Sequence, residues 1–200
     1  RYAVVEMGAN HPGEIAYLSA MARPDIAVIT NAAAAHLEGF GSVDGVARAK
    51  GEIFEGLGRE GVAVVNVDDP HAPLWERLAE RHTVAGFGSA AGANVSADWA
   101  PADTGTRLTL HAPGGTQAVS LPLPGRHNVM NALAATAAAL AAGASLASVQ
   151  AGLEAVRPVT GRMQFRQVRG GASLIDDSYN ANPASLESGL EVLAAREGRR

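Results

Sequence analysis

The N-terminal half of the chain alternates short apolar runs with segments of helical periodicity, and this alternation limits the folds open to it. We expect strands at Tyr2–Glu6, Ile26–Thr30, Val62–Val67 and Thr83–Phe87, because these runs are apolar and rich in strand-forming residues. Strands that alternate with helices are typical of parallel sheets with helical crossovers. The pattern therefore predicts an α/β fold in which a mostly parallel sheet is flanked by helices.

Three helices are expected in these crossovers. One begins near Glu14, one extends from Ser42 to about Leu57, and one begins at Pro70. Ser42 is a typical N-cap, because its hydroxyl can accept a free backbone N–H of the first turn. The residues of the first helix expected to share one apolar face are Ile15, Leu18, Met21 and Ala22.

The pattern changes between Asn94 and Leu121. Short alternating runs are separated by turn-forming residues at 103–105 and 113–115, which predicts a small antiparallel β insert. An almost uniformly apolar helix is expected over Asn128–Ala142 and should be buried. Another helix is expected after a Ser145 N-cap.

Arg157-Pro158 is the expected domain boundary, which divides the chain into domains 1–157 and 158–200. Beyond it we expect a hairpin that turns at Gly170-Gly171, followed by a helix capped by Asn182. This second unit is too small to fold alone and is expected to be truncated. The first is expected to be truncated too, because the Tyr2–Glu6 run already reads as a buried strand.

Composition excludes several classes of protein. Sixteen Lys and Arg against twenty Asp and Glu give a net charge of −4, and no basic stripe indicates a nucleic-acid partner. The chain has no cysteine, so disulfides and thiolate zinc sites are excluded, which agrees with a cytoplasmic enzyme. The longest apolar stretch, Ala132 to Ala144, is too short for a membrane span.

Lys50 lies in the middle of the apolar stripe of the helix that begins at Ser42. Burial favours the neutral amine, which can react with carbon dioxide to form a carbamate, an anionic metal ligand. The alternative is a lysine whose stem lies along the apolar surface while its charge reaches solvent.

Glu6 and His36 follow the first two expected strands. Ligands of open parallel sheets bind beyond the carboxyl ends of the strands, so both side chains are candidates for one rim of the sheet. A carboxylate there suits Mg²⁺, which prefers oxygen ligands. Each residue also has a structural alternative, as a helix cap or as a bonded loop histidine.

A second group of candidates surrounds the start of the Asn128–Ala142 helix. His127, Asn128 and Asn131 fall within one helical turn, where an imidazole and two amides can stack on and hydrogen-bond a purine. Asn128 could instead be a simple N-cap. Farther along, Arg162 could bind a phosphate through two N–H groups, and Asp177 lies in a dense polar turn suited to ribose and phosphate contacts.

Read in order, these segments resemble the Mur ligases, the muropeptide ligases that build the bacterial cell-wall precursor. The resemblance covers nearly the whole chain, and 8–11 and 176–182 point to members that join D-alanyl-D-alanine to a UDP-muramoyl tripeptide. The matching segments are Glu6–Ile15, Ala35–Ser42, Ala49–Phe54, Leu123–Asn131, Gly161–Arg162 and Asp176–Pro183.

The resemblance implies a three-domain ligase whose central, P-loop ATPase-like domain occupies most of 1–157, with 158–200 beginning the C-terminal domain. In the family, ATP phosphorylates the carboxylate of the UDP-muramoyl peptide, and an amine then attacks the acyl phosphate. The resemblance gives Glu6 as a Mg²⁺ ligand, and His36 and the Lys50 carbamate as partners of a second Mg²⁺. These three residues form the expected catalytic set.

The resemblance also implies an ATP site. It places His127, Asn128 and Asn131 at adenine, Arg162 at the γ-phosphate and Asp177 at the ribose. A monomeric parent enzyme is expected.

The family's glycine-rich phosphate loop is not found in these 200 residues, and we expect it upstream of Arg1. The fragment alone is therefore expected to be inactive. Three alternatives stay open: a folylpolyglutamate- or cyanophycin-synthetase-like ligase, a metal-dependent amidohydrolase with a carbamylated lysine, and a non-catalytic nucleotide-binding scaffold.

Overall fold

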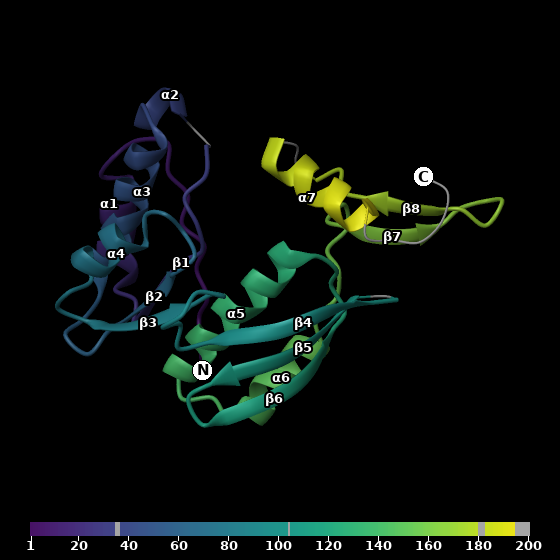
Figure 1. The fold of residues 1–200 in the computed structure, drawn as a ribbon. Helices are drawn as coiled ribbons and strands as arrows, with labels where there is room; N and C mark the ends of the chain where they lie inside the picture. The colour runs from purple at the N-terminus through teal and green to yellow at the C-terminus, as the bar shows by residue number, and fades with distance from the viewer. Residues whose placement is uncertain (35–36, 104, 180–182, 195–200) are drawn as a thin grey trace. The chain divides into compact units, whose positions relative to one another are not determined.

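The structure, a computed structural model, describes residues 1–34, 37–103, 105–179 and 183–194. The chain forms two compact units (Figure 1). Unit 1 comprises Arg1–Ser96 and Ala134–Ala144, and unit 2 comprises Ala97–Leu133 and Ser145–Arg200. The domain boundary expected at Arg157-Pro158 stays a prediction.

Unit 1 is built on a three-stranded sheet in the order β1-β2-β3. Its strands are β1 (Ile26–Ile29), β2 (Val62–Asn66) and β3 (Thr83–Phe87). Both pairings are parallel, and the carboxyl ends of all three strands therefore lie on one edge of the sheet. The parallel sheet predicted from the sequence is confirmed.

The crossovers of unit 1 carry short helices. They are α1 (Glu14–Ala22), α2 (Leu37–Phe40), α3 (Val43–Gly51), the 3₁₀ turn η1 (Glu52–Gly56) and α4 (Ala72–Leu78). The Ser42 cap is confirmed, since its hydroxyl accepts the Gly45 N–H at 3.1 Å. No helix in the described part of the chain has the length and hydropathy needed to cross a bilayer.

Two of these helices differ from the predicted bounds for local reasons. The helix expected to run to Leu57 tightens into η1, because the Ile53 carbonyl accepts from the Ser19 hydroxyl and Leu57 N–H bonds Phe54 instead. The helix expected from Pro70 begins at Ala72. Before it, the Asn66 and Asp69 side chains accept the Asp68 and His71 N–H groups, which holds this segment as a turn and delays helix formation.

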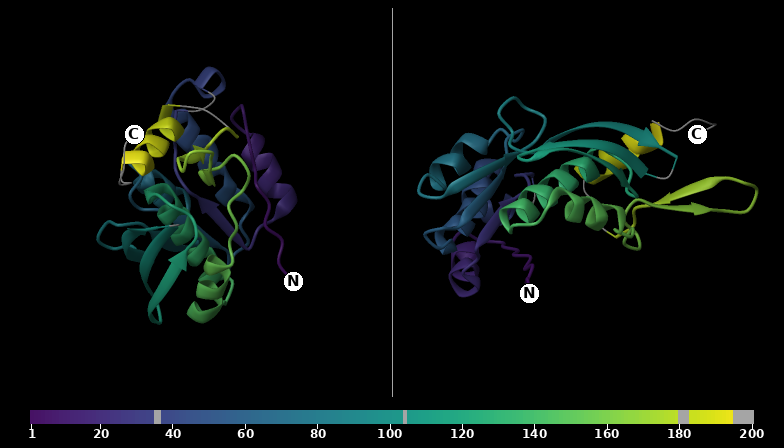
Figure 2. Two further views of the ribbon diagram at one scale, coloured as in Figure 1. Left: turned by 90° about the vertical axis from the view of Figure 1, so that its right-hand side faces the viewer. Right: turned by 90° about the horizontal axis from the view of Figure 1, so that it is seen from below.

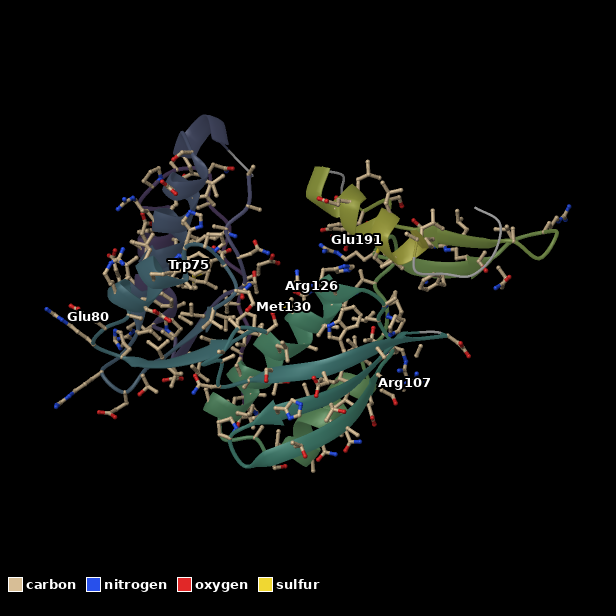
Figure 3. All side chains as sticks on the ribbon, viewed as in Figure 1. Trp75, Glu80, Arg107, Arg126, Met130 and Glu191 are labelled. Atoms are coloured by element: carbon tan, nitrogen blue, oxygen red, sulfur yellow. The ribbon has the colours of Figure 1, made fainter. Side chains whose placement is uncertain are left out.

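Trp75 of α4 is the largest side chain in the core of unit 1, and it is fully buried (Figure 3). Its indole N–H donates to the Ala47 carbonyl of α3 at 2.9 Å, so one residue joins two helices by packing and by a hydrogen bond. The buried residues around it are Ala27, Ile29, Phe54, Leu57, Ala63, Val65, Ala72 and Ala79.

The predictions for the first 22 residues were partly wrong. Tyr2–Glu6 forms no strand, and the side chain of Val4 is 99% exposed. A strand needs a hydrogen-bonded neighbour, and no described strand pairs with this run. In α1, Ile15 and Ser19 are buried while Met21 and Ala22 are exposed, because η1 packs against the Ser19 side of the helix.

Unit 2 contains the predicted antiparallel insert. Its sheet has the order β4-β5-β6, where β4 is Ser96–Ala102, β5 is Gly105–Ala112 and β6 is Gly115–Leu121. β5 and β6 pair antiparallel, and α6 (Leu146–Glu154) lies alongside β6 (Figure 2). Helix α5 (Arg126–Ala141) begins in unit 2 and ends in unit 1.

The predicted hairpin is present as β7 (Gln164–Gln167) and β8 (Ser173–Asp176). Its tight turn is closed by a Gly171 N–H to Val168 carbonyl bond, so the turn is one residue earlier than expected. Helix α7 (Pro183–Ala194) follows. Its expected cap, Asn182, lies outside the described residues. The leucines that share one side of this helix, Leu186, Leu190 and Leu193, are exposed.

We predict that Trp75→Phe lowers the free energy of unfolding by about 2 kcal/mol or more, because it leaves a cavity and removes the buried hydrogen bond to the Ala47 carbonyl. Urea unfolding followed by far-ultraviolet circular dichroism measures this change. The matched control is Trp99→Phe, at the chain's other tryptophan, which is 42% exposed and should change stability by no more than about 0.5 kcal/mol. Equal effects of the two substitutions would contradict the role given to Trp75.

Candidate functional site

Lys50 reaches a loop at the carboxyl edge of the unit 1 sheet. It is half-buried on α3, and its Nζ donates to the Asn31 carbonyl, just beyond β1, at 2.7 Å. Burial lowers the pKa of Lys50, while the nearby carboxylate of Asp69 acts in the opposite direction. The side chain therefore ends at a backbone carbonyl. A carbamate nitrogen keeps one N–H, so this bond suits both the ammonium and the carbamate.

The described part of the chain does not place Glu6 or His36, the other members of the expected catalytic set, beside Lys50. Glu6 is exposed in an irregular segment, so the prediction that it ends a buried strand is wrong. His36 lies outside the described residues. Within 1–34, 37–103, 105–179 and 183–194, no three His, Asp or Glu side chains are grouped to hold a metal ion. The Mg²⁺ site stays a prediction.

In unit 2, the first turn of α5 presents the predicted imidazole and amides. His127 is half-buried, and burial lowers its pKa, against the opposing charges of Asp177 and Glu191. Glu191 lies on α7, opposite the end of α5 that carries Arg126 (Figure 3). The imidazole is therefore favoured in its neutral form, although two carboxylates are near.

The two asparagines of this turn differ in their surroundings. The helix begins at Arg126, so Asn128 is inside the first turn and is not its N-cap. Its side-chain amide donates back to the Pro124 carbonyl at 2.8 Å, which fixes its orientation. Asn131 is exposed one turn later, with its side chain on the outer surface of α5.

Gly125 allows α7 to approach this turn. Its φ of +93° lies in the region that favours glycine. A Cβ there would lie 2.8 Å from Val192 Cγ2 of α7 and 2.9 Å from His127 Cε1. The imidazole is thus packed where α7 meets the start of α5.

The polar turn after β8 is bonded to the residues that precede β7. Asp177 accepts the Met163 N–H at 3.0 Å, and the Tyr179 N–H donates to the Gly161 carbonyl at 2.9 Å. The guanidinium of Arg162 lies 4.2 Å from the centre of the Tyr179 ring, a cation–π contact. Arg162 and Asp177 are therefore held in one small region.

The neighbouring Asp176 bonds other residues than Asp177 does. It accepts the Ser178 hydroxyl at 2.6 Å and pairs with Arg166 at 3.0 Å. The Ser178 hydrogen bond is the main cause that lowers the pKa of Asp176. This carboxylate is used within the turn and the hairpin, which leaves Asp177 as the residue of the pair beside Gly161–Met163.

Sequence reasoning missed Asn66, the last residue of β2, and Asp68 and Asp69 of the turn that follows it, which bond the loops after β1 and β3. A signal was present, since an amide at the end of a buried strand is followed within three residues by two carboxylates. In an open parallel sheet that position is the rim where ligands bind.

Comparison with known proteins agrees with this architecture. The family model described as the Mur ligase middle domain matches residues 1–139. The UDP-N-acetylmuramoyl-tripeptide–D-alanyl-D-alanine ligase of Escherichia coli is 46% identical over 201 residues, which cover 100% of this chain and 44% of that protein. The ligase of the same name from Haemophilus influenzae is 45% identical over 194 residues, which cover 96% of this chain and 42% of that protein.

Solved structures give the same result. MurF from Acinetobacter baumannii superposes with a TM-score of 0.93 at 41% identity, covering 98% of this chain and 43% of that one. MurF from Thermotoga maritima in complex with ADP has a TM-score of 0.84 at 28% identity, covering 96% and 44%. The chain thus spans less than half the length of these relatives. With its parallel sheet, its antiparallel insert and a family match over most of its length, the chain belongs to the Mur ligase family.

Proposed function

We propose that the protein carrying this chain is an ATP-dependent, ADP-forming ligase that joins D-alanyl-D-alanine to a UDP-N-acetylmuramoyl-tripeptide. The observation that carries this proposal is the 46% identity across the whole chain to the Escherichia coli ligase of that name. The product is a peptidoglycan precursor, and ATP supply places the reaction in the cytoplasm.

The proposed reaction has two transfers. The γ-phosphoryl group of ATP moves to a carboxylate oxygen of the tripeptide, and ADP leaves. The amine of the dipeptide then attacks the acyl carbon, phosphate leaves, and the nitrogen loses a proton as the amide forms. Both steps develop charge on phosphoryl oxygens, so cationic groups and fixed donors are the expected means of catalysis.

We assign the nucleotide to residues of unit 2. The neutral imidazole of His127 offers a flat face for adenine, and the amides of Asn128 and Asn131 offer hydrogen bonds to its edge. Arg162, held over Tyr179, is assigned to the γ-phosphate, and Asp177 to the ribose. In support of these roles, the Asn128 amide and the Arg162 guanidinium are already oriented by contacts within the chain.

We assign one Mg²⁺ to Glu6 and a second to His36 and a carbamate of Lys50, as the family resemblance implies. A bound Mg²⁺ would neutralise charge on the transferring phosphoryl group. Lys50 supports this assignment through its lowered pKa, because a neutral amine is the form that reacts with carbon dioxide.

The full-length protein tests the proposed activity. We expect ADP release that requires ATP together with both the UDP-muramoyl tripeptide and D-alanyl-D-alanine, and a product whose mass shows one new amide. ADP release with a glutamate acceptor, and none with the dipeptide, would favour a folylpolyglutamate-synthetase-like ligase instead.

Asn131→Ala should raise the KM for ATP about fivefold and leave kcat nearly unchanged. Adenine lies far from the transferred phosphoryl group, so losing one amide contact, worth about 1 kcal/mol, weakens ground and transition states alike. Because Asn131 is exposed on a helix, alanine should not lower the melting temperature. Steady-state kinetics and thermal unfolding check both points, and an unchanged KM would remove Asn131 from the nucleotide site.

Lys50→Ala should nearly abolish amide synthesis if Lys50 is carbamylated, and added short-chain carboxylates should partly restore it by filling the vacated space. Lys50→Met keeps the stem and removes the nitrogen, so it should be inactive too. Arg48→Met is the matched control, because Arg48 is an exposed cation on the same helix, and it should have normal turnover.

Near-normal turnover of Lys50→Met would rule out the carbamate and leave Lys50 as a structural residue. An inactive Lys50→Ala that no carboxylate restores would assign the function to the ammonium and its bond to Asn31.

A further inference from the structure

Asp69 is a buried carboxylate for which the family resemblance provided no role. Its side chain is 5% exposed and lies in the turn after β2. One oxygen, Oδ2, accepts the Ala32 N–H at 2.8 Å. The other, Oδ1, accepts the His71 N–H at 2.8 Å and lies 3.0 Å from Nδ1 of the same residue. Both oxygens of this buried carboxylate therefore have hydrogen-bond donors, as a buried polar group requires.

The loop bonded by Asp69 is fixed at successive residues. Asn66 Nδ2 donates to the Thr30 carbonyl at 2.7 Å, and Lys50 Nζ donates to the Asn31 carbonyl at 2.7 Å. Ala32, the next residue, is held by Asp69. Three successive residues at the start of this loop therefore each have a backbone group bonded to a side chain.

Asp69 is also connected to the helix that carries Lys50. His71 Nε2 lies 2.9 Å from Asp44 Oδ1 in the first turn of α3. The imidazole thus bridges two carboxylates, and the hydrogen bond with Asp44 is the main cause that raises the pKa of His71. The charge of Asp69 additionally favours the ammonium form of Lys50. Asp69 therefore acts on both partners of the Lys50–Asn31 bond, the loop through Ala32 and the helix α3 through His71.

We propose that Asp69 is a positioning residue of the ligase, which sets the loop 30–34 and through it the placement of Lys50. The bonds to Ala32 and His71 carry the proposal. What the loop does in catalysis rests on the proposed function.

Asp68 provides a matched control at the adjacent position. Its carboxylate accepts the Ser89 N–H and hydroxyl and the Ala90 N–H, each at 2.8 Å. These bonds fix the loop after β3, on the other side of the central strand. The same substitution, Asp to Asn, therefore removes one charge from this turn in each case and weakens its bonds to one loop or to the other.

Hydrogen exchange of the full-length protein tests the positioning directly. Asp69→Asn should speed exchange in peptides over 30–34 by about tenfold and leave 88–91 unchanged, since one charge-assisted bond to a loop amide is weakened. Asp68→Asn should speed exchange over 88–91 and leave exchange over 30–34 unchanged. Unchanged exchange over 30–34 in Asp69→Asn would overturn the proposal, whether or not the protein proves to be this ligase.

Turnover tests the catalytic consequence. We expect Asp69→Asn to lower kcat at least about tenfold with little change in the KM for ATP, because misplaced groups cost rate more than nucleotide affinity. Asp68→Asn should retain kcat within about threefold. A loss no larger for Asp69→Asn than for Asp68→Asn would overturn the proposal, whereas an inactive wild type would instead refute the proposed function.

If Asp69→Asn fails to fold, His71→Gln tests the same proposal. It removes the bridge to Asp44 and one partner of Asp69, so a smaller rise in exchange over 30–34 and a smaller fall in kcat are expected. No change in either quantity would count against Asp69 as the residue that holds the loop.

Discussion

The hydrogen bonds of the turn after β2 hold the carboxyl rim of the unit 1 sheet. β2 is the central strand, so a turn at its end lies between the loops that follow the two outer strands. Asp69 bonds one of these loops and Asp68 bonds the other, while Asn66 bonds both Thr30 and the turn itself. Since loop backbone outside a sheet has no ladder to satisfy it, these side chains supply the missing partners.

The pKa values of Lys50 and His127 are lowered, whereas the pKa of His71 is raised. Burial lowers the first two, because both groups lose solvent around the charged form. His71 is half-buried, and two hydrogen-bonded carboxylates raise its pKa. Direct hydrogen bonds to an anion therefore outweigh desolvation at His71, whereas more distant charges do not outweigh it at His127.

The sequence predicted the elements whose pattern is local. The strands at Ile26–Thr30, Val62–Val67 and Thr83–Phe87, the Ser42 cap and the hairpin were confirmed, because periodicity and turn residues determine them. The strand expected at Tyr2–Glu6 was not confirmed. Apolar residues indicate only a tendency to form a strand, and whether a neighbouring strand is there to pair with depends on the whole fold.

The site was predictable in part for the same reason. Lys50 was expected on an apolar face and is half-buried, but its bond to Asn31 joins residues distant in sequence, which no helical spacing can indicate. Asp69 was missed because two acidic residues after a strand look like an ordinary polar turn. Only the parallel pairing of β1 with β2 shows that Asp69 meets the loop after β1.

The close approach at Gly125 restricts what this gene can tolerate. Any single-base change that replaces glycine introduces a Cβ or a stop, and a Cβ here meets Val192 and His127 while the backbone keeps a positive φ. In a library of all codon substitutions, position 125 should therefore be depleted of every missense variant, including alanine. The neighbouring Arg126 is exposed and should accept many replacements. A sharp step in mutational tolerance between adjacent codons would mark where two helices meet.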